Sequence, residues 1–344
     1  MGCAVVSEDA MRFLRKRPYR KKYAKQETFR QLIAMMDRRF RKGFSSYWEQ
    51  FGYEIGGPVC YAYTRWIIEQ LSSSYQDISD IIFIARDGWI LKQVYEKLTV
   101  YDNRIKAHYV YAPRSLKRTC QTEKGLNEYR AYIEGLGLGK GRIVTVDTGS
   151  MNFSGQKLIQ KAVDQKVTGF YWVALNANPH YEKSGRVRSY QKQHYHRIRC
   201  WNLMEFIMTS PESPIKDFHS GKPEYDRGNS YENQRKTDFL EMEKGILAYI
   251  DDISSTYTTL PFLLEEDIRE WVNDFLKHPD KEDKKAFAAV RFSEREDHSD
   301  DIPLRPFKKK RLTIKENIWI FSQKYPWLYR VLHKGNGWLK RIKK

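Results

Sequence analysis

The sequence lacks the features that mark membrane-spanning, secreted and disulfide-bonded proteins. It contains no run of about 18 apolar residues, which argues against a transmembrane helix. Its N-terminus has no apolar signal-peptide region. The four cysteines are far apart and form no Cys-x-x-Cys pair. We therefore expect reduced cytosolic thiols, and neither a disulfide framework nor a zinc site.

Several common catalytic motifs are also missing. The sequence has no Gly-x-Ser-x-Gly elbow, no Walker loop and no Gly-x-Gly-x-x-Gly after a predicted strand. Its eight histidines show no metal-ligand spacing such as His-Glu-x-x-His. These absences argue against serine hydrolases of the elbow type, P-loop NTPases, dinucleotide-binding enzymes and zinc hydrolases.

The positive charge of the chain is concentrated at its two ends. The 344 residues carry a formal net charge of +18. Residues 1 to 42, a predicted basic arm or helix, hold 13 Lys and Arg against four acids, and residues 303 to 344 hold 13 against one. Such ends usually meet an anionic partner, although solvated tails that keep a protein soluble have the same composition.

The C-terminal tail, residues 303 to 344, favours a membrane surface as that partner. Its basic residues alternate with large apolar ones, including Trp319, Phe321, Trp327 and Trp338. Trp and Tyr prefer the headgroup boundary, and Lys and Arg face anionic lipid. Nucleic acids use similar residues for stacking, but no nucleic-acid-binding module accompanies the tail. We predict a cytoplasmic protein on the inner face of the cell membrane, with no nucleic-acid partner.

Strand and helix patterns alternate over residues 43 to 200. Strands are predicted at Ile81 to Ala85, His108 to Ala112, Ile143 to Val146 and Thr168 to Leu175, with helices at Trp89 to Leu98, Asn127 to Glu134 and Gln156 to Val163. This alternation predicts an α/β domain with a doubly wound, mostly parallel sheet. The segment Phe51 to Leu71 predicts a loop at Gly56-Gly57-Pro58, followed by an amphipathic helix.

The strand signals fade after about residue 200, and residues 201 to 302 predict a helical extension. Helices are expected at Met204 to Met208, Thr237 to Ile253, Glu265 to Leu276 and Asp283 to Val290. The segment Pro211 to Asn229 is rich in Pro, Gly and polar residues, which predicts a loop or lid.

The first strand-loop-helix unit, residues 80 to 98, ends its strand in Arg86-Asp87-Gly88. Glycine permits φ > 0 and a close approach of the backbone, and arginine offers a fork for an anion. Asp87 has a structural alternative as a helix N-cap. A basic cluster, Arg114, Lys117 and Arg118, follows the next strand, either as a solvated face or as a group that closes around a diphosphate.

The second unit, residues 142 to 163, places Asp147 at the end of its strand. Asp147 is followed by the small and hydroxyl residues Thr148, Gly149, Ser150, Ser154 and Gly155. An acid in this position accepts hydrogen bonds from sugar hydroxyls or helps to hold Mg²⁺, and the turn offers backbone N–H groups to a phosphate. An ordinary turn after a strand is the structural alternative. Two such loops predict a substrate with phosphates at both ends.

A resemblance to a known family covers residues 52 to 175 most strongly. The motifs that carry it are FGYEIGGPVCYAY, IIFIARDGWILKQVYEKL, PRS, VDTGSMNFSG and MEFIMTSPESP. They resemble a bacterial domain of capsule and O-antigen loci that is often fused to a haloacid-dehalogenase-type phosphatase. That domain in turn is similar to type I phosphoribosyltransferases.

The resemblance implies a role for each candidate residue. Asp147 would contact the ribose hydroxyls of phosphoribosyl pyrophosphate and help to hold Mg²⁺, and Glu205 would position or deprotonate an acceptor hydroxyl. The 5-phosphate would lie against Thr148, Gly149, Ser150, Ser154 and Gly155, and the pyrophosphate against Arg86, Asp87, Gly88, Arg114 and Lys117. Glu205 has an alternative as an exposed helix charge.

The chain departs from the family pattern in two ways. Thr148 stands where a second acid is common, and no Asp-x-Asp-x-Thr motif of the phosphatase opens the chain. A separate phosphatase of that type is therefore an expected partner.

Three functions follow from these residues as hypotheses. The first is a glycosyltransferase that moves ribose 5-phosphate from phosphoribosyl pyrophosphate to a hydroxyl of a lipid-linked glycan in bacterial surface polysaccharide synthesis. The second is a sugar-phosphate hydrolase. The third is a non-catalytic scaffold on the membrane, for which Thr148 is the best support.

Overall fold

The computed structural model describes most of the chain between residues 22 and 307. The described ranges are 22–100, 102, 104–113, 116–150, 152–174, 186–191, 200, 202–213, 215–219, 222–225, 235–292 and 302–307, with the backbone alone at residues 28, 117, 216, 217 and 292. The predicted membrane-binding tail from residue 308 onward and the first 21 residues lie outside the described part of the chain. No helix of the described part is long and apolar enough to cross a membrane.

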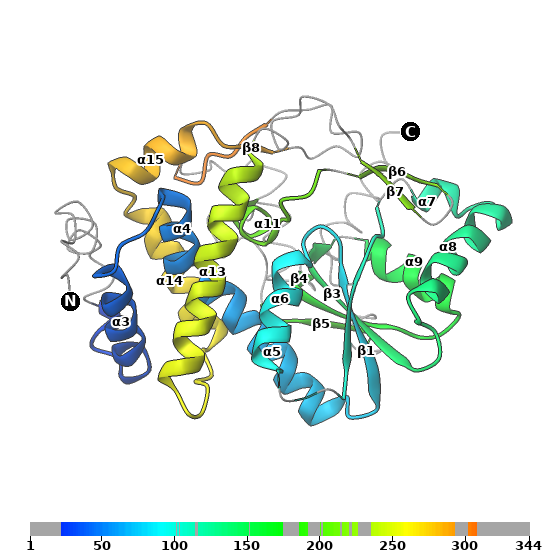
Figure 1. Ribbon diagram of the computed structural model, residues 1–344, viewed down its shortest axis with the longest axis horizontal. Coiled ribbons are helices and arrows are strands. Elements are labelled where there is room, and N and C mark those ends of the chain that lie inside the picture. The colour runs from blue at the N-terminus through cyan, green and yellow to red at the C-terminus, as the bar shows by residue number, and fades with distance from the viewer. Residues whose placement is uncertain are drawn as a thin grey trace, which may run out of the picture.

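A parallel sheet of five strands forms the centre of the α/β part, as the sequence predicted (Figure 1). The strands are β1 (Ile78–Ile84), β2 (Lys106–Val110), β3 (Arg142–Ser150), β4 (Thr168–Ala174) and β5 (Val187–Ser189), in the order β2-β1-β3-β4-β5. The short edge strand β5 was not predicted. Its three residues are too few to show a strand period.

Helices cover both faces of the sheet. On one face, Ile81 and Phe83 of β1 share a hydrophobic core with α5 (Gly57–Ser74), α6 (Trp89–Leu98) and α13 (Lys236–Thr256). On the other, Ile82 and Ile84 pack against α8 (Glu123–Gly135) and α9 (Ser154–Val163). Alternate residues of one strand thus face opposite layers, because side chains alternate across a strand. The chain is a doubly wound α/β fold.

The helical extension packs beside the first of these layers. It contains α11 (Asn202–Met208), α13, α14 (Glu265–Lys277) and α15 (Lys281–Ala288). Two helices from the N-terminal part of the chain, α3 (Glu27–Phe40) and α4 (Tyr47–Phe51), pack against α13. The predicted helices of residues 204 to 290 are confirmed, with boundaries shifted by a few residues. Side chains of α3, α13 and α14 belong to the same hydrophobic core as the α5 face of the sheet.

Two predicted loops contain regular structure. Gly56 and Gly57 do not form a loop, because a π-helix (Gly52–Gly56) joins α4 directly to α5. Glycine serves close packing here: a Cβ on Gly52 would lie 2.1 Å from the Met242 carbonyl oxygen of α13. The predicted loop of residues 211 to 229 contains an antiparallel hairpin, β6 (Ile215–His219) and β7 (Lys222–Tyr225).

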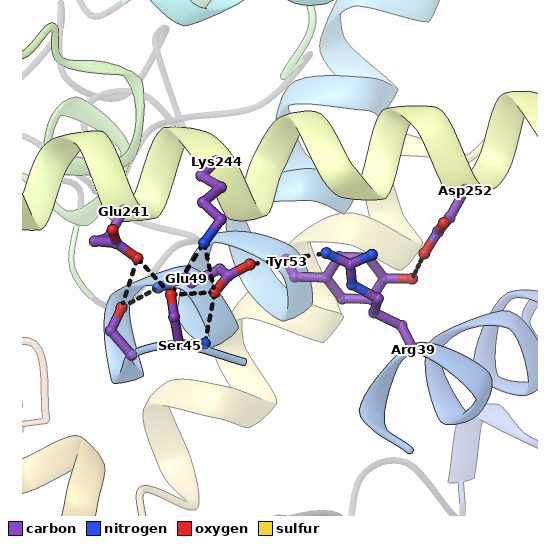
Figure 2. A network of polar contacts seen from close by, with 8 residues as sticks. Arg39, Ser45, Glu49, Tyr53, Glu241, Lys244 and Asp252 are labelled. Atoms are coloured by element: carbon purple, nitrogen blue, oxygen red, sulfur yellow. Dashed lines mark hydrogen bonds and ion pairs between the residues drawn. The ribbon is translucent and has the colours of Figure 1, made fainter. Parts of the chain in front are cut away.

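A polar network fastens α13 to the N-terminal helices (Figure 2). The Glu49 carboxylate is 4% exposed and accepts hydrogen bonds from the Ser45 N–H (2.7 Å) and hydroxyl (2.6 Å). Lys244 Nζ lies 3.3 Å from it, and Arg39 Nη2 lies 3.7 Å away. Burial alone raises the pKa of Glu49, but the Ser45 hydrogen bonds and Lys244 outweigh it, so the pKa is lowered.

Candidate functional site

The candidate site lies at the carboxyl edge of the sheet, where β1 and β3 are neighbours. After β1 the chain passes to β2 on one side, and later strands continue from β3 on the other. In open α/β sheets, ligands bind at such a switch point, and the order 2-1-3-4-5 places it between the first and third strands. Both predicted loops follow these two strands.

The loop after β1 is a tight turn built on Gly88. A Cβ there would lie 2.7 Å from the Ile84 carbonyl oxygen, so only glycine fits against the end of the strand. The Gly88 N–H donates to that same oxygen at 2.7 Å. The predicted close approach is present, but the predicted positive φ is not, because Gly88 has φ −79°.

Arg86 and Asp87 occupy this turn and are partly exposed. Helix α6 begins at Trp89 with Gly88 at the N-cap and without a side-chain cap, so the interpretation of Asp87 as N-cap is wrong. Burial and Glu212 raise the pKa of the Tyr109 hydroxyl, and the charge of Arg86 opposes that rise.

Asp147 lies near the end of β3 and is partly exposed. Its Oδ1 accepts the Thr148 N–H at 2.8 Å, and its carbonyl oxygen accepts the Tyr63 hydroxyl at 2.9 Å. Burial raises the pKa of Tyr171, and the negative charge of Asp147 raises it further. These hydrogen bonds hold Asp147 in place, and the residue stays partly exposed near the end of β3.

The three residues after Asp147 belong to β3 and not to the loop. Gly149 and Ser150 pair with Val173 and Ala174 of β4, so the strand is four residues longer than predicted at this end. The Thr148 side chain is fully buried, and its hydroxyl lies 3.1 Å from the Met208 sulfur. The buried Thr148 side chain cannot contact a phosphate in this arrangement. The predicted phosphate contact of Thr148 is therefore kept only for its backbone. An acid at this position would stand in the core.

The turn from β3 into α9 passes through Phe153, which has φ 54°. A left-handed conformation is unusual for a large side chain and points to a constrained turn. The Phe153 N–H donates to Ser150 Oγ at 2.8 Å, and its ring packs 5.1 Å from that of Tyr171. Helix α9 then begins at Ser154 without a side-chain cap.

Gly155 places the N-terminus of α9 next to the end of β1. A Cβ on Gly155 would lie 3.1 Å from Ile84 Cδ1 and 3.7 Å from the Ala112 Cβ beyond β2. A helix N-terminus presents N–H groups and the positive end of its dipole to an anion. The structure therefore brings Ser154 and Gly155 to the same edge as Arg86, Asp87 and Gly88.

Of the other predicted site residues, Glu205 is fully described, Lys117 in part, and Arg114 not at all. Arg114 lies outside the described residues, and Lys117 is described in its backbone alone, within a short helix, α7 (Leu116–Thr119). Glu205 is on α11, partly exposed, one turn before the Met208 that contacts Thr148.

The donor groups of this edge suit a magnesium ion that is shared with a substrate. Among the described residues, no cluster of three or more His, Cys, Asp or Glu side chains is placed to hold a metal ion. Mg²⁺ at phosphate sites usually takes one or two carboxylates together with phosphate oxygens and waters. Asp147 supplies one carboxylate, which fits an ion that enters with a phosphorylated substrate.

Glu212, to which the sequence analysis gave no role, also lies near the end of β2. Glu212 accepts hydrogen bonds from the Tyr109 and Tyr111 hydroxyls, each at 2.9 Å. The sequence indicated only that Tyr109 and Tyr111 share one face of a predicted strand. No local pattern predicted their contact with Glu212, which lies 101 to 103 positions away.

Comparison with models of protein families gives no match for this chain, and comparison with curated proteins gives no match either. The functional conclusion therefore depends on the site and on the motif resemblance.

Proposed function

We propose that this chain is a glycosyltransferase of the phosphoribosyltransferase type. It would move ribose 5-phosphate from phosphoribosyl pyrophosphate to a glycan hydroxyl in bacterial surface polysaccharide synthesis and release pyrophosphate. The observation that supports it best is the contact of Gly155 with Ile84, which sets the N-terminus of α9 beside the loop after β1. A donor with a phosphate at one end and a diphosphate at the other fits two adjacent anion-binding elements.

The roles of the residues follow from the chemistry of this donor. The N–H groups at Ser154 and Gly155 would bind the 5-phosphate, and the Asp147 carboxylate would accept hydrogen bonds from the ribose hydroxyls. Arg86 would hold the diphosphate as it leaves, because its fork matches phosphate oxygens. Asp147 would share Mg²⁺ with the donor, and the ion would neutralise charge on the leaving group. Positioning and charge stabilisation are the expected sources of rate.

The proposal includes the expected surroundings of the enzyme. The basic, Trp-rich tail would hold it on the anionic inner face of the cell membrane, where lipid-linked acceptors are assembled. A separate phosphatase of the haloacid-dehalogenase type would act on the phosphorylated product.

Titration calorimetry with phosphoribosyl pyrophosphate and Mg²⁺ tests the donor site. Arg86→Ala is expected to weaken binding by roughly tenfold to a hundredfold, the usual worth of a hydrogen bond between charged groups. The Asp147→Asn variant should also fail to transfer a pentose phosphate to an acceptor. Mass spectrometry of synthetic glycans incubated with the enzyme and donor measures this transfer.

A matched control is Asp251→Asn, which removes an exposed carboxylate paired with Lys97 in the last turn of α6, at the opposite end of that helix from Gly88. Binding and turnover should not change in this variant. Release of free phosphate without an acceptor would favour the hydrolase, and a wild-type protein that binds no phosphoribosyl pyrophosphate would refute the proposal.

A further inference from the structure

Four aromatic side chains line the site beyond the end of β2. We call Trp89, Tyr109, Tyr111 and Tyr225 the aromatic wall. Its neighbouring rings are 5.3 Å, 5.4 Å and 6.3 Å apart, centroid to centroid, in edge-to-face arrangements. All four side chains are partly exposed. Trp89 comes from α6, Tyr109 from β2 and Tyr111 from the residue just after it, whereas Tyr225 comes from the β6-β7 hairpin, 114 positions beyond Tyr111.

The Glu212 carboxylate is held in place by this wall. Its two oxygens accept one tyrosine hydroxyl each, and the Tyr111 hydroxyl also lies 2.8 Å from that of Tyr225. The Glu212 N–H donates to the buried Ser210 Oγ at 3.2 Å, which fixes the backbone. An ionised carboxylate has about four acceptor positions. The two tyrosines use two of them, and Glu212 is only partly buried, so the others can serve a ligand.

The wall stands next to the loop that would hold the diphosphate. Trp89 directly follows Gly88 at the start of α6, and its ring contacts Tyr109. The Arg86 guanidinium is close enough to influence the Tyr109 hydroxyl electrostatically. A group bound at Glu212 would therefore lie beside the bond that breaks in the donor.

The chemistry of this surface selects a neutral, hydroxyl-rich ligand. Aromatic faces bind the apolar C–H faces of a ring by burial, and a few fixed polar groups orient it. A phosphate or carboxylate would be repelled by Glu212. A wholly apolar ligand would strip water from the carboxylate without replacing its hydrogen bonds. A neutral sugar ring meets both requirements.

We propose that Glu212 binds the attacking hydroxyl of a neutral sugar acceptor whose ring packs against the aromatic wall. The inference rests on the proposed function, because it assigns the acceptor half of the same site. In the transfer, the acceptor oxygen forms a bond to the anomeric carbon of the donor. The bond from that carbon to the diphosphate breaks, with its electron pair on the leaving oxygen, and the acceptor proton passes to Glu212. The role that the resemblance implies for Glu205 thus falls to Glu212.

Saturation-transfer NMR on the full chain, with neutral methyl glycosides of galactose, glucose, mannose and N-acetylglucosamine as probes, tests the binding step. The wild-type protein should transfer saturation to the ring protons of at least one glycoside. Glu212→Gln and Tyr111→Phe should weaken that signal at least tenfold. Glu224→Gln, which removes an exposed carboxylate beside Tyr225, should leave it unchanged.

Kinetics and donor binding separate a catalytic role from a structural one. Glu212→Gln should lower kcat for the best glycoside by about a hundredfold or more, in the usual range for loss of a general base. Its affinity for phosphoribosyl pyrophosphate in calorimetry and its unfolding temperature should stay the same.

The inference is overturned if Glu212→Gln keeps full acceptor turnover, if it loses donor binding and folding stability together, or if the wild-type protein contacts none of the glycosides. Failure of the proposed function has a different signature: no binding of phosphoribosyl pyrophosphate, with glycoside contacts at the wall retained.

Discussion

Glu49 illustrates how a single charge acts in the core of this protein. Its carboxylate is 4% exposed, yet it lies between Lys244, Arg39 and the Ser45 hydroxyl (Figure 2). Burial of a charge is costly unless the charge is paired and hydrogen-bonded, and here both conditions are met. The ionised form is therefore favoured in the folded state, in agreement with the lowered pKa of Glu49.

We predict that Glu49→Gln lowers the free energy of unfolding by about 2 kcal/mol at pH 7, the typical cost of leaving buried partners unsatisfied. A group with a lowered folded pKa stabilises above its unfolded pKa and loses that effect as pH falls. The difference in unfolding free energy between wild type and variant should thus be largest above the ordinary pKa of 4.5 and decrease as the pH falls below it. Urea unfolding at several pH values measures it.

The control is Glu69→Gln, at an exposed carboxylate 3.8 Å from Arg65 on α5. A surface pair of this kind contributes little, so its effect should stay under about 0.5 kcal/mol. A gap for Glu49→Gln that does not change with pH would contradict the assigned ionisation.

At the scale of elements, the crossing of α13 over α4 and the π-helix depends on backbone contact. A Cβ on Gly245 of α13 would lie 1.9 Å from the Glu49 carbonyl oxygen and 2.7 Å from the Tyr53 nitrogen. These are backbone atoms, which cannot turn away as a side chain does. The two segments meet at this distance only because glycine stands on α13.

We expect Gly245→Ala to destabilise the fold by about 1–3 kcal/mol, the usual cost of overpacking, in spite of the better helix propensity of alanine. Gly135→Ala is the matched control at the end of α8, where an added Cβ meets nothing within 4 Å. Thermal unfolding of both variants decides the matter. Equal stability of Gly245→Ala and wild type would show that the crossing is looser than described.

The elements also explain which parts of the site were accessible to sequence reasoning. Helix α6 was predicted with its observed ends, and both loops follow the strands expected. The position of Arg86 relative to its strand comes from local patterns of period two and 3.6, which neighbouring residues establish without the rest of the fold. Asp147 was expected at the end of its strand but lies within β3, which continues to Ser150 by pairing with β4.

At the scale of the whole molecule, the first residues of the predicted tail, 303 to 307, belong to the folded body. Leu304 is buried, and the Phe307 ring lies 5.5 Å from Phe275 and 5.4 Å from Phe287. A truncation after Pro303 would therefore remove part of the core, whereas one after Phe307 keeps these contacts and removes residues 308 to 344.

We predict that the chain ending at Phe307 loses flotation with vesicles of anionic phosphatidylglycerol, while the full chain floats with them. The expected reason is attraction of about 1 kcal/mol for each Lys or Arg near the surface. Raising the salt to 1 M should release the full chain, because screening shortens the range of that attraction. Unchanged flotation of the truncated chain would contradict a membrane role of the tail. Equal unfolding temperatures would confirm that the body is intact.

The sequence by itself determined the α/β class, the order of most strands and helices, and the charged loop that follows β1. Local periodicity encodes these features, because each depends on neighbours within a few residues. The tertiary structure alone decided that Gly56 and Gly57 lie within helices packed against α13, and that Thr148 faces the core. It also decided that Glu212 meets Tyr109 and Tyr111. These outcomes depend on contacts between segments about 60 to 190 positions apart, for which no local pattern exists.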